Sequence, residues 1–279
     1  MWPHSETIPL QAAEFTILRD LIQERAGMFF DNDKRELLAE KLAGRVVERG
    51  FRTFLDYYYL LKYGPDAESE WPHVLDALSV QETYFWREID QIHALTRDIL
   101  PPYAASCPAV PVQIWCAACA TGEEPLTIAM ALLEADWFAR LPIRIVASDA
   151  SRAAIAKARH GIYRERSFRT LPKSLQNKYF AQVEGGWQAA AELSSRIEFY
   201  EANLMRPEEI ESLARSPFIF CRNVFIYFAP RDIARTVRLF ARNMPRPGYL
   251  FVGASESLLR LNTDFELHTA GDAFVYRLK

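Results

Sequence analysis

The residues best suited to chemistry follow a short apolar segment near the middle of the chain. Residues 112–117 are apolar enough for a buried strand, and residues 118–122 are small and end in glycine. Glu123, Glu124 and Pro125 come next and open a helical pattern. A strand, a turn of small residues and a helix start are what an α/β nucleotide site needs, because small side chains let the backbone approach a ligand. The two carboxylates at the positive end of a helix attract a cation, so we expect a ligand with a positive centre.

The same turn also bears on two other kinds of site, a nicotinamide dinucleotide site and a zinc or redox site formed by cysteines. It contains one glycine, Gly122, so it lacks the G-x-G-x-x-G of nicotinamide dinucleotide enzymes, and an oxidoreductase is disfavoured. Cys116 and Cys119 form a C-x-x-C, which suits zinc only with a second pair or suitably spaced histidines, and the five histidines are scattered. A redox pair is possible in principle. We predict two small buried residues at the strand end and no metal site.

Polar residues also end two later apolar segments. Asp149 follows residues 143–148, and an acid at the end of a second parallel strand commonly binds ribose hydroxyls. The alternative is an N-cap for the next helix, and the ribose role is favoured. Arg222 and Asn223 follow the apolar residues 218–221. Open parallel sheets bind ligands at such carboxyl ends, and an Asn there can hydrogen-bond both a cofactor and a nucleophile.

The elements that position these residues fall into two regions. Apolar residues recur at helical spacing from about residue 8 to 100, which predicts a helical domain at residues 1–88. Strands and helices then alternate, which predicts an α/β domain at residues 89–279. Within it, the less regular stretch at about 175–200 is expected to form short antiparallel strands, the last of them at 196–200. Antiparallel edge strands at 265–267 and 273–277 close the main sheet.

The totals exclude several classes of protein. The 279 residues are 50% hydrophobic and 13% aromatic, so disorder is not expected. A net charge of −3 gives no global drive toward nucleic acid or an anionic membrane. No apolar run approaches the roughly 18 residues of a spanning helix, and the N-terminus lacks the regions of a signal peptide. Four cysteines in a chain of this length predict reduced thiols and a cytoplasmic location.

Several segments, in order, resemble the CheR-type chemoreceptor methyltransferases. They are Cys116-Ala117-Ala118-Cys119-Ala120-Thr121-Gly122-Glu123-Glu124-Pro125; Gln81-Glu82-Thr83-Tyr84-Phe85-Trp86-Arg87, where the family has N-x-T-x-F-F-R; Phe218-Ile219-Phe220-Cys221-Arg222-Asn223-Val224-Phe225-Ile226-Tyr227-Phe228; and residues 248–257, similar to G-x-L-F-x-G-x-S-E-S. The resemblance implies a class I S-adenosylmethionine-dependent methyltransferase: a Rossmann-like, mostly parallel sheet with an N-terminal helical domain and a small antiparallel β subdomain inserted at about 175–200.

The resemblance also implies roles for individual residues, with S-adenosylmethionine as cofactor and S-adenosylhomocysteine as product. Arg87 is expected to grip the methionine carboxylate with two parallel hydrogen bonds, although an ordinary pairing with Glu88 or Asp90 is the alternative. Glu123, chosen over Glu124, is expected to bind the α-ammonium, and Asp149 the ribose. The other expected cofactor residues are Gln81, Thr83, Asn203, Leu204, Asn223 and Val224. The expected catalytic residues are Arg87, Asn223 and Tyr227, with the Tyr227 hydroxyl near the transferred methyl.

The activity implied is O-methylation of glutamate side chains on a chemoreceptor. A glutamate is ionised at pH 7, so no strong base is required. The alternative is a cofactor-binding regulator without turnover. The expected partner is the receptor's cytoplasmic helical domain, and a receptor C-terminal peptide at the β subdomain is a further possibility. The expected docking residues share one exposed helix stripe, for which a merely solvated face has equal weight: Lys34, Lys41, Arg45 and Arg49.

Overall fold

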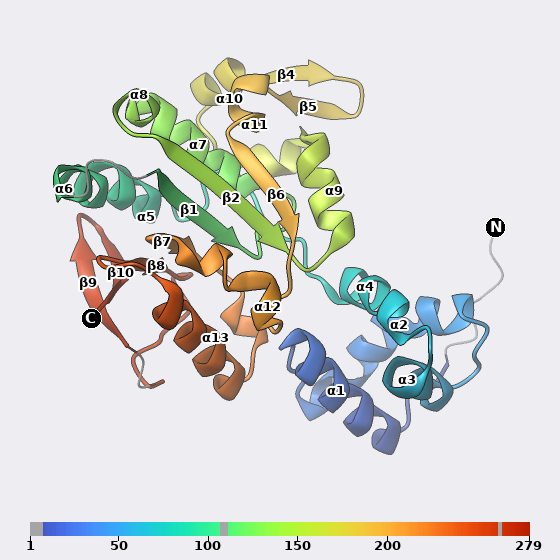
Figure 1. Ribbon diagram of the computed structural model, residues 1–279. Helices are drawn as coiled ribbons and strands as arrows, with labels where there is room; N and C mark the ends of the chain where they lie inside the picture. Colours follow the sequence, from blue (N-terminus) through green and yellow to red (C-terminus); the bar gives the residue numbers. More distant parts are fainter. Residues whose placement is uncertain (1–7, 107–110, 262–263) are drawn as a thin grey trace. The chain divides into compact units, whose positions relative to one another are not determined.

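The computed structural model describes residues 8–106, 111–261 and 264–279 (Figure 1). The chain divides into two compact units. The first comprises the residues up to Val80 together with Tyr227–Ala229, and the second comprises Gln81–Ile226 and Pro230–Lys279. Within these described ranges, no helix combines the length and the apolar character needed to cross a membrane.

The first unit is built from four α-helices around one apolar core. Gly27, with φ of 72°, ends the first helix, and the Thr53 hydroxyl accepts a hydrogen bond from the amide of Asp56 to begin the third. Leu18, Ile22, Leu38 and Leu42 are among the core side chains without exposure, as their helical spacing predicts. The helices are α1 (Ala12–Ala26), α2 (Arg35–Glu48), α3 (Phe54–Tyr63) and α4 (Ala67–Leu78), with a short 3-10 helix, η1, at Asn32–Lys34.

The second unit contains a seven-stranded sheet in the order β6-β2-β1-β7-β8-β10-β9. Neighbours from β6 to β8 pair in parallel, and β10 is antiparallel to both β8 and β9, as predicted for the closing strands. The strands are β1 (Val112–Ala117), β2 (Ile143–Asp149), β6 (Ile197–Glu201), β7 (Phe218–Phe220), β8 (Tyr249–Phe251), β9 (Phe265–Ala270) and β10 (Ala273–Leu278). This order places the ends of β1, β2 and β7 side by side, where open α/β sheets bind ligands.

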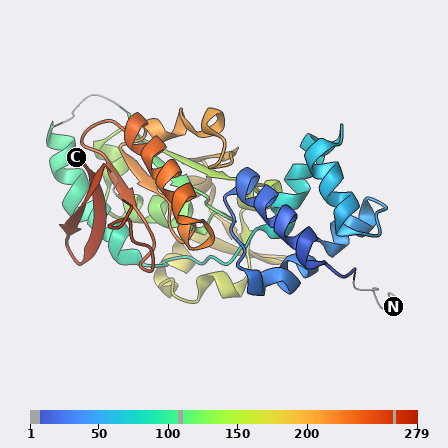
Figure 2. The same ribbon diagram turned by 90° about the horizontal axis from the view of Figure 1, so that it is seen from below.

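Helices cover both faces of the sheet, because side chains alternate along each strand. Ile114 and Cys116 of β1 pack in a core cluster with residues of α7, whereas the ring of Trp115 lies 5.3 Å from that of Phe240 on α13. Figure 2 shows α13 in orange at the surface of this unit. The longer helices are α5 (Ile89–Ala94), α6 (Leu100–Ser106), α7 (Glu123–Glu134), α9 (Arg152–His160), α10 (Lys173–Tyr179) and α13 (Pro230–Asn243). The shorter ones are η2 (a π-helix, Leu95–Ile99), α8 (Trp137–Arg140), η3 (Glu165–Phe168), α11 (Ala191–Ser194), α12 (Pro207–Ile210), η4 (Leu213–Arg215) and η5 (Phe225–Tyr227, which crosses into the first unit).

A second, three-stranded antiparallel sheet has the order β3-β5-β4, from β3 (Ile162–Tyr163), β5 (Gly186–Ala189) and β4 (Phe180–Val183). The small β subdomain is therefore present, but the expected assignment of residues 196–200 to it is wrong. Those residues fall in β6, where Ile197 pairs with Ile145 of the main sheet. Residues 162–163 supply the third strand instead, and Gly186 allows the close approach, because a Cβ there would lie 2.3 Å from the Tyr163 carbonyl oxygen.

The boundary between the units also differs from the expected one after residue 88. Residues 81–88 belong to the second unit. Phe85 is fully buried there, and its ring centroid lies 4.9–5.0 Å from those of Tyr163, Phe168 and Phe180. Burying such an aromatic side chain is worth about 2–3 kcal/mol, which ties the segment to the small sheet.

Candidate active site

The turn after β1 has the backbone conformation of a tight ligand-binding turn. Ala118 and Ala120 have φ of 58° and 48°, and Gly122 has φ of 94°. A Cβ at Gly122 would lie 3.0 Å from the Cβ of Ala158, so glycine is required for both conformation and space. Left-handed alanines cost of order 1–2 kcal/mol each and persist only where neighbours hold them.

Asp149, at the end of β2, holds that turn. One carboxylate oxygen accepts a hydrogen bond of 2.9 Å from the amide of Ala120, and the other accepts one of 2.8 Å from the amide of Ser151. The N-cap of α9 is Ser151, whose hydroxyl accepts from the amide of Ala154. The alternative reading of Asp149 as a helix cap is therefore wrong, and its carboxylate lies where the loops after β1 and β2 meet.

Glu123 is enclosed by the protein. It is 3% exposed, and its carboxylate accepts hydrogen bonds from the hydroxyls of Thr121 (2.6 Å) and Ser167 (2.9 Å). Burial raises the pKa of this carboxyl group. Glu123 also lines a cavity of about 450 Å³ together with the predicted cofactor residues Gln81 and Thr83. The Gln81 side-chain oxygen in that cavity accepts from the Lys157 ammonium at 2.7 Å, and Asp149 does not line the cavity.

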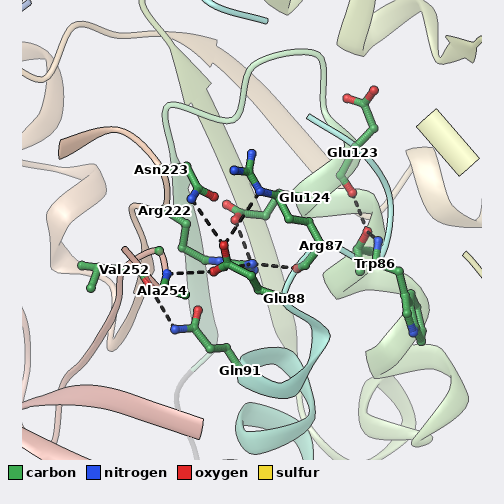
Figure 3. Close-up of polar contacts among 12 residues, drawn as sticks. Trp86, Arg87, Glu88, Gln91, Glu123, Glu124, Arg222, Asn223, Val252 and Ala254 are labelled. Atoms are coloured by element: carbon green, nitrogen blue, oxygen red, sulfur yellow. Dashed lines mark hydrogen bonds and ion pairs between the residues drawn. The ribbon is translucent and has the colours of Figure 1, made fainter. Parts of the chain in front are cut away.

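Glu124 points in a different direction from Glu123 and faces Arg222, which follows β7 (Figure 3). Its carboxylate lies 3.5 Å from the Nη1 atom of Arg222 and its side chain is 17% exposed. Burial raises the pKa of Glu124 to about 7, against the opposing effect of Arg222 and with the support of nearby Glu88. Successive residues of a helix point about 100° apart, so one carboxylate of the pair reaches the strand end, and sequence spacing does not say which.

Arg222 is the buried cation of this cluster, and its role could not be predicted from its position in the sequence. Its Nη2 atom donates to the carbonyl oxygen of Arg87 at 2.6 Å and lies 3.4 Å from a carboxylate oxygen of Glu88 (Figure 3). Its buried Nε atom has no hydrogen-bond partner among the described residues. A buried donor without a partner costs about 1–3 kcal/mol, which marks this position as one that a ligand or water completes.

Asn223 is held in a left-handed conformation, φ of 58°, by the carboxylate of Glu256. That carboxylate accepts hydrogen bonds from the backbone amides of Asn223 (2.8 Å), Gly253 (2.6 Å) and Ile226 (3.2 Å). The Asn223 side-chain nitrogen lies 3.4 Å from Glu88, and a Cβ at Gly253 would come within 2.5 Å of it. Glu256 was missed as a site residue, although its place just after an apolar strand was a usable signal.

Arg87 borders the same cluster with its guanidinium loosely held. Its Nη1 atom donates to the carbonyl oxygen of Glu82 at 3.2 Å, and its Nε atom lies 3.9 Å from Glu88. The guanidinium carbon lies 5.5 Å from the ring centroid of Tyr84. The pairing with Glu88 exists but is long, so most of the hydrogen-bonding capacity of Arg87 is available to a ligand.

The remaining predicted residues occupy other positions. Asn203 and Leu204 follow β6 and are buried, and the Asn203 side-chain oxygen accepts from the amide of Met205 at 2.9 Å. Val224 is buried next to Asn223. Tyr227 lies in the first unit, where its carbonyl oxygen accepts from the amide of Phe29 at 2.8 Å and its side chain is partly exposed.

The cysteines of the turn are buried thiols. Cys116 and Cys119 are free and at most 2% exposed, and burial raises both pKa values well above the usual range. Protonated, enclosed thiols are poor nucleophiles and poor metal ligands, so they act as small core residues here. Cys107 lies outside the described residues.

The expected docking stripe, here called the α2 stripe, runs along α2 from Lys34, just before the helix, to Arg49, just after it, and is only partly exposed. Arg45 pairs with Glu70 of α4 through contacts of 2.8–3.0 Å, with the Arg45 side chain 19% exposed and Glu70 3% exposed. Tyr57 also donates to Glu70 at 2.7 Å. The expectation of one exposed stripe is wrong for Arg45, because a buried carboxylate requires a cation beside it. The other three keep partners of their own: Arg49 with Asp66 (3.3 Å) and Glu70 (3.6 Å), Lys41 with the carbonyl oxygen of Leu78 (3.2 Å), and Lys34 with Asp33 (3.4 Å).

Two family models and curated relatives match most of this chain. The family model "CheR methyltransferase, SAM binding domain" matches residues 81–274, and "CheR methyltransferase, all-alpha domain" matches residues 13–79. The chain is 34% identical over 263 residues to chemotaxis protein methyltransferase 2 of Vibrio cholerae, which covers 93% of this chain and 91% of the relative. It is 31% identical over 271 residues to the chemotaxis protein methyltransferase of Escherichia coli, covering 94% and 91%. Among solved structures, magnesium protoporphyrin IX methyltransferase from Synechocystis with bound S-adenosylmethionine matches 79% of this chain and 91% of that chain, at 14% identity and a TM-score of 0.32.

The two family models follow each other along the chain as predicted, the all-helical one first and the cofactor-binding one second. The main sheet is mostly parallel, as predicted. The predicted family, fold class and cofactor are therefore confirmed. The chain belongs to the CheR methyltransferase family and is an S-adenosylmethionine-dependent methyltransferase.

Proposed function

We propose that this enzyme methylates glutamate side chains on the cytoplasmic helical domain of a chemoreceptor. The observation that carries the proposal is the polar cluster at the ends of β1 and β7, where Glu124, Arg222 and Asn223 meet beside Arg87. The names of the relatives, chemotaxis protein methyltransferases, support the pathway.

Together with Asp149, the residues of this cluster suit a ligand with an ammonium, a carboxylate and a sugar. Glu124, in place of Glu123, receives the α-ammonium in our proposal. Its carboxylate faces the strand end and has no close hydrogen bond from any residue that the structure describes, whereas Glu123 accepts from two hydroxyls. Arg87 takes the methionine carboxylate and Asp149 the ribose. The other proposed cofactor residues are Gln81, Thr83, Asn203, Leu204, Asn223 and Val224.

In the proposed reaction the main task of the protein is to align the substrate carboxylate with the methyl group. Bound S-adenosylmethionine supplies a methyl group made electrophilic by the sulfonium. The substrate glutamate is already a carboxylate at pH 7, so the enzyme holds it in line rather than deprotonating it. Asn223, locked by Glu256, offers its amide to the incoming carboxylate, and Tyr227 is the second proposed catalytic side chain. Alignment of this kind is worth up to roughly 7–11 kcal/mol, and exclusion of water keeps the carboxylate reactive.

Two receptor contacts are part of the proposal. The receptor's helical domain docks on the members of the α2 stripe that remain accessible, Lys34 and Arg49, with Lys41 beside them and Arg45 serving mainly the fold. A receptor C-terminal peptide adds as a further strand beside β4, which is an edge strand of the small sheet as the structure describes it. A substrate of this kind places the enzyme in the cytoplasm.

The test is transfer of label from [methyl-³H]S-adenosylmethionine to purified cytoplasmic fragments of chemoreceptors. We expect alkali-labile label, with mass mapping that places methyl esters on glutamates. The matched comparison is Asp149→Ala, which is expected to lose transfer through loss of cofactor binding. If S-adenosylhomocysteine binds tightly and no receptor fragment is labelled, the regulator without turnover replaces this proposal.

A further inference from the structure

Helix α13 carries a row of arginines that the methyltransferase site does not use. Arg231, Arg235, Arg238 and Arg242 recur at intervals of four, three and four residues. At about 100° per residue they fall within an arc of about 60°, and with a rise of about 1.5 Å they span about 16 Å along the helix. All four are exposed.

The positive charge of this row is not neutralised within the part of the chain that the structure describes. There, Arg235, Arg238 and Arg242 have neither an ion pair nor a side-chain hydrogen bond, and Arg231 has only its neighbour Asp232, at 3.5 Å, with its own side chain 72% exposed. The α2 stripe is the opposite case, because Arg45 is occupied by Glu70. A chain with a net charge of −3 therefore keeps a local concentration of unpaired cations on one helix.

The fold fixes where this row points and where it begins. The opposite face of α13 is buried through Val237 and Phe240, and Phe240 packs on Trp115 of β1 (Figure 2 shows the helix in orange). The helix starts at Pro230, a few residues after Asn223 at the end of β7. The row thus begins near the reacting end of the sheet and leads away from it along the surface of the second unit.

We propose that this arginine row is a docking surface for an acidic helix, and specifically for the methyl-accepting helices of the receptor. This inference rests on the proposed function. Residues at i and i+4, or i and i+3, on a helix have Cβ atoms about 5–6 Å apart, so acidic residues at this spacing match the spacing of the arginines. Guanidinium groups bind carboxylates with two hydrogen bonds. A helix laid along the row would bring its carboxylates in succession toward Asn223.

Two other anionic partners fit the surface less well. A lipid surface is normally entered by apolar side chains as well, and the large apolar residues Val237 and Phe240 of α13 are buried in the protein. Nucleic acid is favoured by a broad basic field, whereas the basic charge here is one row on a chain of net negative charge.

The test compares pairs of charge reversals of equal net charge. Arg235→Glu/Arg238→Glu alters the row, and Arg97→Glu/Arg140→Glu alters two exposed arginines, on η2 and α8, that lack ion pairs within the described residues. A third variant, Arg235→Lys/Arg238→Lys, keeps the charge. The probe is a fluorescent, alanine-rich helical peptide with glutamate at every third or fourth position, titrated at low salt and followed by anisotropy. Calorimetry with S-adenosylhomocysteine reports whether each variant is folded.

We expect the row reversal to weaken peptide binding by about tenfold or more, while the control pair and the lysine pair stay within about threefold of wild type. Binding by wild type should fall steeply with salt, and that dependence should flatten in the row reversal. With a methylatable receptor fragment, the row reversal should raise KM and leave kcat unchanged.

Three results would overturn the inference: equal losses in the row and control reversals, no loss in either, or tighter binding of a DNA duplex or an anionic vesicle that the row reversal abolishes. Failure of the proposed function looks different. If peptide binding follows the arginines and no receptor fragment is methylated, the docking surface stands and the glutamate-methylation proposal falls.

Discussion

The variant Glu124→Gln tests which of the two carboxylates at the start of α7, Glu123 or Glu124, binds the ammonium of the cofactor. In the free enzyme, the pKa of Glu124 is raised from 4.5 to about 7, chiefly by burial. A raised pKa means that the folded protein binds the proton more tightly than the unfolded chain does, so the free energy of unfolding falls as the pH rises from about 4.5 to about 7. At 1.36 kcal/mol per pKa unit the cost reaches at most about 3 kcal/mol above pH 7.

The variant removes this cost and also removes the proposed ligand of the ammonium. Without cofactor, Glu124→Gln should be more stable than wild type at pH 8 by up to about 3 kcal/mol, reduced by the stabilisation that the lost ion pair with Arg222 provides. Near pH 4.5 the two proteins should be equally stable. Its affinity for S-adenosylhomocysteine should be lower by about 10- to 100-fold, as expected for a lost charge-assisted hydrogen bond of about 1.5–3 kcal/mol.

The pH dependence of binding gives the sharper readout. If the ionised Glu124 receives the ammonium and titrates at about 7, wild-type affinity should rise by about tenfold between pH 6 and pH 8, and that part of the rise should vanish in Glu124→Gln. Isothermal titration calorimetry measures both affinities, and urea unfolding measures the stabilities. Glu123→Gln is the matched control. The reasoning is refuted if Glu124→Gln binds like wild type and Glu123→Gln shows the loss.

Three further substitutions test other parts of the structure. Asp149→Ala should weaken S-adenosylhomocysteine binding at least about tenfold by calorimetry, and unchanged affinity would remove this residue from the ribose site. Glu256→Gln turns an amide group toward backbone donors, so we expect the rate of methyl transfer to fall by about 10- to 100-fold. The control variant Glu198→Gln, at an exposed carboxylate, should keep the wild-type rate, and equal rates of the two variants would contradict the positioning role of Glu256. Glu70→Ala leaves the guanidinium of Arg45 without its buried partner and should lower the free energy of unfolding in urea by about 3 kcal/mol. The double variant Glu70→Ala/Arg45→Ala should lose less, and an equal or larger loss would contradict the ion-pair argument.

Much of the fold could be predicted because the signals were local and repeated. The apolar segment 112–117 and the carboxyl-terminal pair of strands form where their patterns indicate. The small sheet was harder, because a two-residue strand such as Ile162–Tyr163 leaves almost no periodicity in a sequence. Residues 197–201 have a strand pattern, but the pattern does not say which sheet they join, since pairing with Ile145 is a long-range contact.

The site could be predicted to the level of strand ends and not to the level of side-chain direction. Asp149 and Asn223 could be predicted as site residues because Asp149 ends one apolar strand and Asn223 closely follows another. The choice between Glu123 and Glu124 depends on Ser167, far along the chain, whose hydroxyl binds one carboxylate and leaves the other facing Arg222.

A buried ion pair posed the same difficulty on α2. Arg45 has the spacing of an exposed stripe, and its partner Glu70 belongs to another helix. Helical spacing reports which residues share a face, and it does not report what a neighbouring helix places against that face.

The most direct test of the proposed site is a crystal structure of this enzyme with S-adenosylhomocysteine. We expect the ammonium at hydrogen-bond distance from Glu124, the ribose on Asp149 and the methionine carboxylate on Arg87. A ligand whose ammonium lies on Glu123 and whose ribose lies away from Asp149, with Glu124 still turned to Arg222, would contradict the proposed site.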